Sequence, residues 1–170
     1  MTLDSLAALK PVTKGGVVTA GNACPLNDGA AAVVIMSDAK AKALGLTPLA
    51  RIVATGVSGL SPEIMGLGPI EAVKKALGYA KMSISDIDLF EINEAFAVQV
   101  LGSARALGID EDKLNVSGGA IALGHPFGMT GARITATLLN NLATHDKTFG
   151  IETMCVGGGQ GMAMVVERLS

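Results

Sequence analysis

The chain has 170 residues, of which 49% are hydrophobic, 3% aromatic and 16% charged, and its formal net charge is -2. This length predicts one domain with a core of aliphatic and methionine side chains. The small charge, without any basic run, excludes nucleic acid as a partner, and no apolar stretch reaches the ~20 residues of a membrane span. Because no secretory signal pattern opens the chain, we expect a cytoplasmic protein with Cys24 and Cys155 as reduced thiols.

Residues 1–45 carry turn signals and short apolar runs, and they do not complete a structural unit of their own. The pattern predicts a short strand at 17–19, a turn cluster at 23–29, a strand-length apolar run at 30–36 and a helix at 38–44 capped by Ser37. We expect this region to be the end of a preceding domain.

From residue 48 onward, strand and helix patterns alternate along the chain. The predicted strands are 49–57, 89–92, 114–116, 149–156 and 162–169, and the predicted helices are 68–80, 94–107 and 128–144. This β-α-β-α-β-α-β-β order favours an α/β fold with helices on a mostly parallel sheet. The last two strands are close in sequence and are expected to be antiparallel neighbours.

Cys155 stands at the end of a predicted strand and is followed by three glycines, residues 157–159. A thiol acts as nucleophile or base only as thiolate, so a catalytic role requires a site that lowers its pKa. The glycines leave backbone N–H groups, such as that of Gly157, open to a substrate. The alternative is a small buried residue beside an ordinary glycine turn.

His125 lies between glycine and proline in a glycine-rich loop, and Asn93 stands at a strand-to-helix junction. A neutral imidazole at such a bend could donate a hydrogen bond to a developing oxyanion, although a structural histidine is an equal alternative. Asn93 is either a helix N-cap or an amide that holds a water molecule, while Glu94 could cap helix N–H groups. We assign no chemistry to His145, which ends a predicted helix.

Two other kinds of site are not supported. The glycine run 157–161 is followed by a strand pattern, whereas a dinucleotide fingerprint requires a helix there. The chain has no P-loop motif, and its two cysteines and two histidines lack zinc-ligand spacing. We therefore expect no metal site.

Three motifs occur in a specific order: Asn-Glu-Ala-Phe at 93–96, Gly-Gly-Ala-Ile-Ala-Leu-Gly-His-Pro at 118–126 and Cys-x-Gly-Gly-Gly at 155–159. This ordered set resembles the C-terminal part of thiolases. The segments 19–24 and 27–32 are similar to the segment that closes the first half of that family. The details from Cys24 to Asn27 and from Pro126 to Gly131 look most like actinobacterial thiolases, a subgroup that includes enzymes acting on steroid side chains.

The resemblance implies one half of a duplicated α/β fold. Residues 1–45 would be the incomplete end of the N-terminal half, and residues 46–170 the C-terminal thiolase domain. The implied reaction is thiolysis of a 3-oxoacyl-CoA by coenzyme A, as in fatty acid metabolism, or the reverse Claisen condensation. Coenzyme A is then a substrate, no cofactor is implied, and the expected partners are acyl-CoA, further copies of the chain or a separate N-terminal half.

Carried over by position, the resemblance also implies a role for each site residue. Cys155 is the acid/base cysteine. His125 and a water held by Asn93 form one oxyanion hole, and the N–H of Gly157 is half of a second. The substrate-binding positions would be Phe96, Met65, Ala95 and Cys24.

One family feature is missing from these residues, because the nucleophilic cysteine of thiolases lies in the first half of the family. Cys24 is the only other thiol, its position does not match the nucleophile, and many relatives have a serine there. The main hypothesis is therefore half of a thiolase, from a longer gene product or a split enzyme, inactive alone and with an exposed apolar face. The alternatives are a non-catalytic acyl-CoA-binding or interaction protein, and a self-sufficient enzyme that uses Cys24 with His125.

Overall fold

The computed structural model describes residues 2–170, and its elements follow the predicted order closely. They are α1 (Leu3–Ala7), α2 (Asp38–Ala43), β1 (Ala50–Gly59), η1 (Pro62–Leu67), α3 (Gly68–Ala80), η2 (Ile84–Asp86), β2 (Leu89–Ile92), α4 (Ala97–Leu107), η3 (Glu111–Lys113), α5 (Ala120–Leu123), α6 (Thr130–Thr144), β3 (Phe149–Val156) and β4 (Gln160–Arg168). The predicted strand at 114–116 is wrong, because only Leu114 forms a bridge, to Phe90.

A single four-stranded sheet forms the centre of the molecule, in the order β1-β4-β3-β2. The β3–β4 pair is antiparallel, as predicted, and so is the β1–β4 pair, whereas β2 and β3 are parallel. Three strands therefore point the same way, but most of their pairings are not parallel. The expected mostly parallel pairing is not found. The tight turn after β3 reverses the chain, so β4 lies between β1 and β3 and is antiparallel to both.

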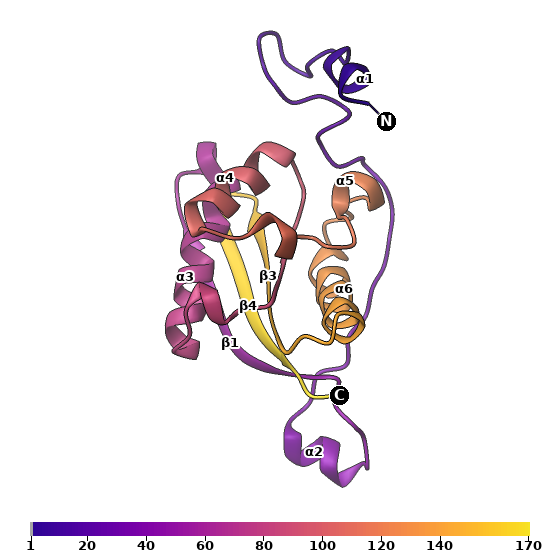
Figure 1. The fold of residues 1–170 in the computed structure, drawn as a ribbon, viewed down its shortest axis with the longest axis vertical. Coiled ribbons are helices and arrows are strands. Elements are labelled where there is room, and N and C mark those ends of the chain that lie inside the picture. Colours follow the sequence, from indigo (N-terminus) through magenta and orange to yellow (C-terminus); the bar gives the residue numbers. More distant parts are fainter. Residues whose placement is uncertain (1) are drawn as a thin grey trace.

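Helices cover both faces of this sheet, with α3 and α4 on one side and α5 and α6 on the other (Figure 1). The inner side of α3 is apolar and fully buried at Ala72, Val73 and Ala76. Backbone contact is close here, because a Cβ on Gly56 of β1 would lie 2.2 Å from the carbonyl oxygen of Ala72. On the opposite face, Leu138 and Leu142 of α6 pack in a second apolar cluster.

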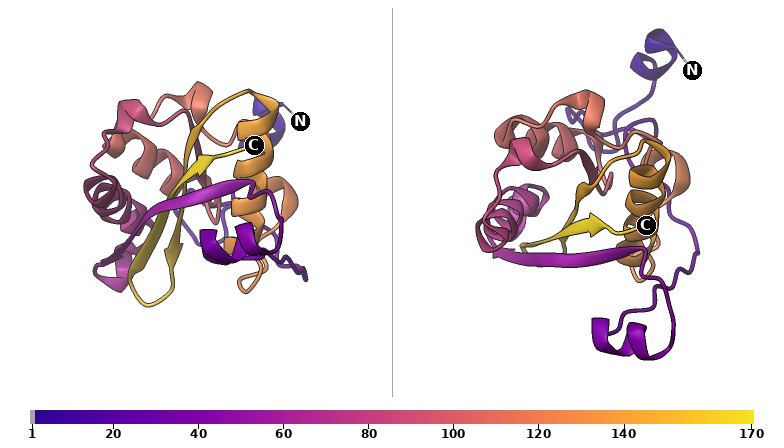
Figure 2. Two further views of the ribbon diagram at one scale, coloured as in Figure 1. Left: turned by 90° about the horizontal axis from the view of Figure 1, so that it is seen from below. Right: turned by 60° about the horizontal axis from the view of Figure 1, so that its bottom comes forward.

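The N-terminal region up to residue 49 lies mostly outside this body, and it contacts the body through Asn22 and Cys24, which hydrogen-bond to Ala97 and Ala95. Helix α1 projects beyond one end and α2 beyond the other (Figure 2). The apolar run 30–36 forms no strand, and Thr19 alone of the predicted strand 17–19 makes a bridge, to Pro11. A strand requires a neighbour to satisfy its backbone groups, and no described segment pairs with residues 30–36. Helix α2 does begin as predicted, because the Ser37 hydroxyl accepts the Lys40 N–H.

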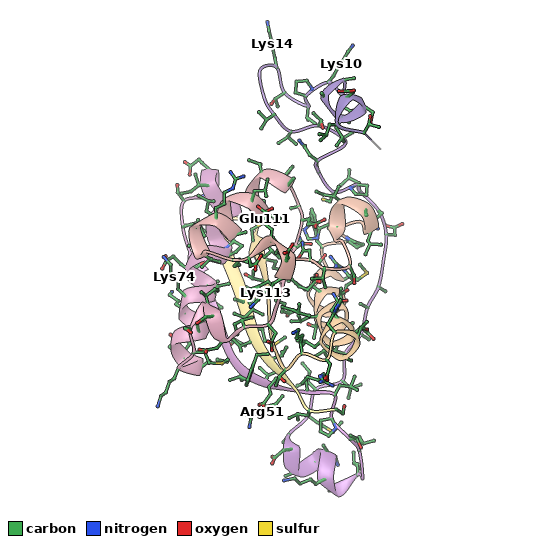
Figure 3. The ribbon with its side chains drawn as sticks, in the orientation of Figure 1. Lys10, Lys14, Arg51, Lys74, Glu111 and Lys113 are labelled. Carbon is green, nitrogen blue, oxygen red and sulfur yellow. The ribbon has the colours of Figure 1, made fainter. Side chains whose placement is uncertain are left out.

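Many charged side chains lie on the outside of the molecule, whereas Glu91 and Glu152 are buried. Figure 3 labels Lys10, Lys14, Arg51, Lys74, Glu111 and Lys113, with Lys10 and Lys14 on the outlying N-terminal segment. The pair of Lys74 and Glu71 on α3 is exposed, at 2.7 Å between nitrogen and oxygen. Among the described helices, none combines the length and the apolar character that crossing a membrane requires.

Candidate active site

The site residues gather where β2 and β3 end. These two strands are parallel, so their carboxyl ends lie at the same edge of the sheet, where α/β proteins commonly bind ligands. Asn93 follows β2 directly, and Cys155 is the penultimate residue of β3. The N–H of Asn93 donates to the carbonyl of Thr153 at 3.0 Å, which ties the two strand ends together.

Asn93 is a rigidly held, buried side chain and not a helix cap. It is 1% exposed, and its carbonyl accepts a hydrogen bond from the Gln99 amide at 3.0 Å. Helix α4 begins only at Ala97, with Phe96 at the N-cap position, so the capping alternative for Asn93 is wrong. The Oδ1 atom of Asn93 is a buried acceptor that has no partner among residues 2–170.

The imidazole of His125 is held on both sides. Its Nε2 lies 3.2 Å from Nδ2 of Asn93, and its Nδ1 lies 2.5 Å from Oγ1 of Thr130. The backbone N–H of His125 donates to Oδ1 of Asn27 at 3.1 Å. The structure thus brings His125 and Asn93 together from positions far apart in the sequence.

The surroundings of His125 favour its neutral form. Burial of the ring lowers its pKa, and the nearby cationic Arg133 lowers this pKa further. All three guanidinium nitrogens of Arg133 are buried without a hydrogen-bond partner in the described part of the chain. A neutral imidazole can act as a hydrogen-bond donor to a carbonyl oxygen without carrying a full charge.

The thiol of Cys155 is 6% exposed, and its environment differs from the expected one. Burial raises the pKa of this thiol, although a backbone hydrogen bond opposes the shift and the Cys24 thiol adds to it. The expected lowering of the pKa is therefore not observed, because desolvation outweighs every stabilising contact. A protonated thiol at neutral pH is suited to giving a proton.

The turn after Cys155 needs glycine at its second and third positions. Gly158 and Gly159 have φ values of 87° and 92°, which side chains rarely adopt. A Cβ on Gly159 would also lie 2.2 Å from the carbonyl oxygen of Leu60. By contrast, a Cβ on Gly157 would meet no atom within 4 Å, so the surface beside its backbone is open.

Glu94 fastens the loop that leads to His125. Its carboxylate accepts hydrogen bonds from the Asn115 amide at 2.8 Å and the Ile121 N–H at 3.1 Å. Glu94 thus caps α5 and not its own helix. A Cβ on Gly119 would come within 2.4 Å of this carboxyl group, so the contact also requires glycine there.

Three of the four predicted substrate-binding residues lie side by side. The N–H of Cys24 donates to the Ala95 carbonyl at 3.0 Å, and Ala23 forms a bridge with Phe96, which is 39% exposed. Met65 lies apart from them on η1 and is half-buried. Burial raises the pKa of the Cys24 thiol, which does not favour a nucleophile at this position.

Sequence reasoning assigned no role to Thr130, Asn27 or Arg133, all of which surround His125. Thr130 stands five residues after His125 at the start of α6, and that spacing was the only sequence signal for the contact. The contact of Asn27 with His125 spans 98 residues and could not be found from spacing.

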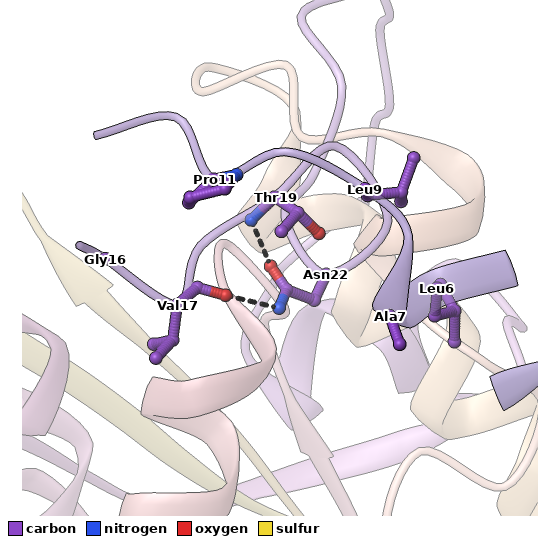
Figure 4. Close-up of a pocket in the computed structure, with 8 residues that line it drawn as sticks. All are labelled: Leu6, Ala7, Leu9, Pro11, Gly16, Val17, Thr19 and Asn22. Atoms are coloured by element: carbon purple, nitrogen blue, oxygen red, sulfur yellow. Dashed lines mark hydrogen bonds between the residues drawn. The ribbon is translucent and has the colours of Figure 1, made fainter. Parts of the chain in front are cut away.

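The surface has an open hollow beside His125 and another in the N-terminal region. One, of about 430 Å³, is lined by Leu26, Asn27, Asp28, His125, Pro126 and Phe127. The other, of about 420 Å³, lies in the N-terminal region and is lined by Leu6, Ala7, Leu9, Pro11, Gly16, Val17, Thr19 and Asn22 (Figure 4). Asn22 holds its rim through hydrogen bonds with Thr19 and Val17.

Within the described residues, no group of three His, Cys, Asp or Glu side chains could hold a metal ion.

Comparison with models of known families gives two matches that together cover most of the chain. Residues 46–168 match the family model for the thiolase C-terminal domain, and residues 1–39 match that for the thiolase N-terminal domain. The chain belongs to the thiolase family.

Individual thiolases are similar over almost the whole chain. The acetyl-CoA acetyltransferase of Escherichia coli (strain K12) is 56% identical over 170 residues, which cover 99% of this chain and 43% of the relative. The 3-ketoacyl-CoA thiolase of Bacillus subtilis (strain 168) is 51% identical over 167 residues, which are 98% of this chain and 43% of that protein. The chain therefore spans less than half the length of these relatives.

Solved thiolase structures confirm the α/β fold. The crystal structure of the Bacillus anthracis acetyl-CoA acetyltransferase aligns with a TM-score of 0.96 at 51% identity, covering 99% of this chain and 43% of that one. Human mitochondrial 3-ketoacyl-CoA thiolase in complex with CoA aligns with a TM-score of 0.93 at 47% identity, covering 100% and 43%.

Proposed function

We propose that this chain supplies the acid/base and oxyanion-binding half of a thiolase active site. The observation that carries the proposal is the contact of 3.2 Å between His125 and Asn93, beside the strand end that bears Cys155. The reaction is acyl transfer between acyl-CoA thioesters and coenzyme A, in the direction of thiolysis or of condensation. Coenzyme A is a substrate here, and the site needs no cofactor.

Each catalytic residue has a role that its surroundings support. Cys155 returns a proton to the α-carbon of the leaving acetyl-CoA, for which its raised pKa is suited, and removes that proton in the reverse direction. The neutral ring of His125 and a water held by the side-chain amide of Asn93 stabilise the enolate oxygen. The open N–H of Gly157 contributes to a second oxyanion hole.

The acyl-CoA chain would enter past the contact between the N-terminal segment and α4. Phe96, Ala95 and Cys24 lie together there, and we assign Met65 of η1 to the same channel from the family resemblance alone. The crystal structure of the human relative in complex with CoA supports coenzyme A as a ligand of the complete enzyme.

The nucleophilic cysteine must come from outside these residues. Apolar side chains between 26 and 49 are strongly exposed, including Leu26 at 94% and Val34 at 86%, and they offer a surface for the complementary half. In this proposal, residues 1–45 close the N-terminal half and 46–170 form the C-terminal domain. The complete enzyme would be a cytoplasmic homo-oligomer of fatty acid metabolism, or a complex with a separate N-terminal half.

A thiolysis assay tests the proposal. The chain is mixed with acetoacetyl-CoA and CoA, alone or after co-expression with the part of the Escherichia coli relative that it does not match. We expect no turnover alone and measurable turnover in the complex. Turnover by the chain alone that is lost in Cys24→Ala would instead establish Cys24 as a nucleophile. A stable complex without turnover would contradict the proposal.

One observation favours a second candidate, an acyl-CoA-binding protein without catalysis. Both thiols of this chain have a raised pKa, so no activated nucleophile is present among the described residues. Calorimetric titration of the chain with CoA separates the two candidates when it is combined with the assay. Binding without turnover in any complex supports this candidate, and the absence of binding excludes it.

A further inference from the structure

The far side of the His125 ring contacts a buried hydroxyl. Oγ1 of Thr130 lies 2.5 Å from Nδ1 of His125 and 3.0 Å from the carbonyl oxygen of Pro126. Thr130 is 0% exposed, so its hydroxyl has no access to solvent and must use these two neighbours. Because a hydroxyl has a single proton, Thr130 can donate to only one of them.

The carbonyl of Pro126 does not need this proton. It already accepts the backbone N–H groups of Met129 at 2.9 Å and of Thr130 at 3.1 Å, in the turn that starts α6. These two bonds use both lone pairs of the oxygen. The Nδ1 atom of His125, in contrast, has Thr130 as its only hydrogen-bond partner within residues 2–170. The shorter distance and the free acceptor both direct the proton of Thr130 to Nδ1.

The other ring nitrogen then carries the proton of the imidazole. A neutral imidazole has one N–H, and burial keeps His125 neutral by lowering its pKa. Nε2 faces the side-chain amide of Asn93 at 3.2 Å. Rotating the Asn93 amide by 180° about its last side-chain bond exchanges the positions of Nδ2 and Oδ1. Oδ1, which is otherwise buried without a partner, then accepts a hydrogen bond from Nε2–H of His125.

We propose that Thr130 is a positioning residue that selects the Nε2–H tautomer of His125. Its hydroxyl donates to Nδ1, so the ring presents a proton and not a lone pair toward Asn93 and the substrate side. The reverse arrangement, with Nδ1–H donating to Thr130 and Thr130 donating to Pro126, would leave Nε2 without a proton for an oxyanion. The catalytic consequence rests on the proposed function, whereas the tautomer itself does not.

Nitrogen-15 NMR of the 170-residue chain measures the tautomer directly, at a pH where the imidazole is neutral. The chain has only two histidines, and the exposed His145 serves as an internal reference. We expect a single Nε2–H tautomer for His125 in the wild-type chain and in Thr130→Ser. Thr130→Val, which keeps the shape of the side chain but removes the hydroxyl, is expected to give a mixture of both tautomers.

Two NMR results would overturn the inference. The first is an Nδ1–H tautomer in the wild-type chain, and the second is a Thr130→Val spectrum with the wild-type tautomer unchanged. Because wild-type protein gives the first readout, the test does not depend on the folding of a variant.

A second readout is the activity of the complemented enzyme, meaning the complex of this chain with the co-expressed part of the Escherichia coli relative that it does not match. Thr130→Val is expected to lower kcat by roughly 10- to 1,000-fold, the upper range for loss of an oxyanion donor, with KM little changed and with recovery in Thr130→Ser. An unchanged kcat in Thr130→Val would overturn the positioning role. Failure of every complex to turn over would overturn the proposed function, and the NMR result would still decide the tautomer.

Discussion

The two ionisable side chains at the centre of the proposed site, Cys155 and His125, are both held neutral. Burial is the main cause in each case, and it shifts the pKa of the thiol upward and that of the imidazole downward. A neutral donor pair is suited to giving protons and hydrogen bonds to an enolate, which is the chemistry expected of this half of a thiolase. Nucleophilic attack, by contrast, requires a thiolate.

The two cysteines provide a matched pair of variants. In the complemented enzyme, Cys155→Ala is expected to lower kcat by at least 100-fold, because the group that moves the α-proton is lost. Cys24→Ala is expected to change KM for acyl-CoA more than kcat, because the proposed function places Cys24 beside the path of the acyl-CoA. Steady-state kinetics of thiolysis measures both, and equal kcat for Cys155→Ala and wild type would refute the assignment.

The glycines of the turn after β3 also form a matched pair. Gly159→Ala is expected to destabilise the fold by about 1–3 kcal/mol or more, because its φ is 92° and its Cβ would lie 2.2 Å from the Leu60 oxygen. Gly157→Ala, whose Cβ would meet no atom, is expected to leave the stability nearly unchanged. Urea unfolding compares the two, and similar stabilities would contradict the described turn.

At the scale of elements, β2, β3 and α6 enclose two acidic side chains. Glu91 and Glu152 are opposite one another on the parallel strands, at 2% and 7% exposed. Asn141 donates to Glu91 at 3.1 Å, and Thr135 donates to Glu152 at 2.7 Å. Burial raises the pKa of each carboxyl group to about 7, although the nearby Arg133 opposes the shift.

These raised pKa values make the stability of the fold depend on pH. The unfolded chain loses the two protons near pH 4.5, but the folded chain keeps them up to about pH 7, so folded protein binds more protons in between. The free energy of unfolding should therefore fall as pH rises from 4.5 to 7, by on the order of 3 kcal/mol for each carboxyl group. His125 acts in the opposite direction below pH 6.5, because its pKa is lowered.

Urea unfolding at pH 5.5 and pH 8 checks this dependence. We expect Glu91→Gln to be more stable than wild type at pH 8 and to lose less stability between the two pH values. Glu71→Gln on the exposed side of α3 is the control and should follow wild type. Wild-type stability that rises with pH over this range would contradict the expectation.

At the scale of the whole molecule, the chain divides into a packed body and an exposed N-terminal region. The body comprises the sheet, α3, α4 and α6, and buries nearly all of the apolar clusters. The segment 25–36 is extended and exposed, with Ile35 at 70%, and it lies against the body mainly near His125. Such backbone, outside any strand pair or helix, opens at little cost in free energy.

Limited proteolysis should therefore cut the free chain first between residues 25 and 37. The expected product is a resistant fragment that begins near residue 38 and reaches the C-terminus, identified by mass spectrometry. In a complex with the complementary half, the same segment is expected to be protected. First cleavage inside β1, α3 or β4 would contradict the division into body and exposed region.

Much of the fold could be predicted from the sequence, because its signals are local. Proline and glycine mark the start of α3, an apolar face marks α4, and the glycine turn predicts the β3–β4 hairpin. Residues 30–36 are as apolar as a buried strand, and a strand was predicted there. A strand also needs a neighbouring strand to pair with its backbone groups, and whether one is present depends on distant parts of the chain. The pairing of β4 with β1 was missed for the same reason.

The order of the three motifs was enough to indicate the family, and it made Cys155, His125 and Asn93 the candidate site residues. Their local sequence carries that information, because each motif is a turn or strand end with a specific residue type. The states of these groups were decided by the packed structure. Burial raised the pKa of Cys155 where a lowered value was expected, and the Thr130 hydroxyl came to lie against the ring of His125. Desolvation and hydrogen-bond geometry depend on which distant atoms exclude water from a group, and only the packed chain brings those atoms together.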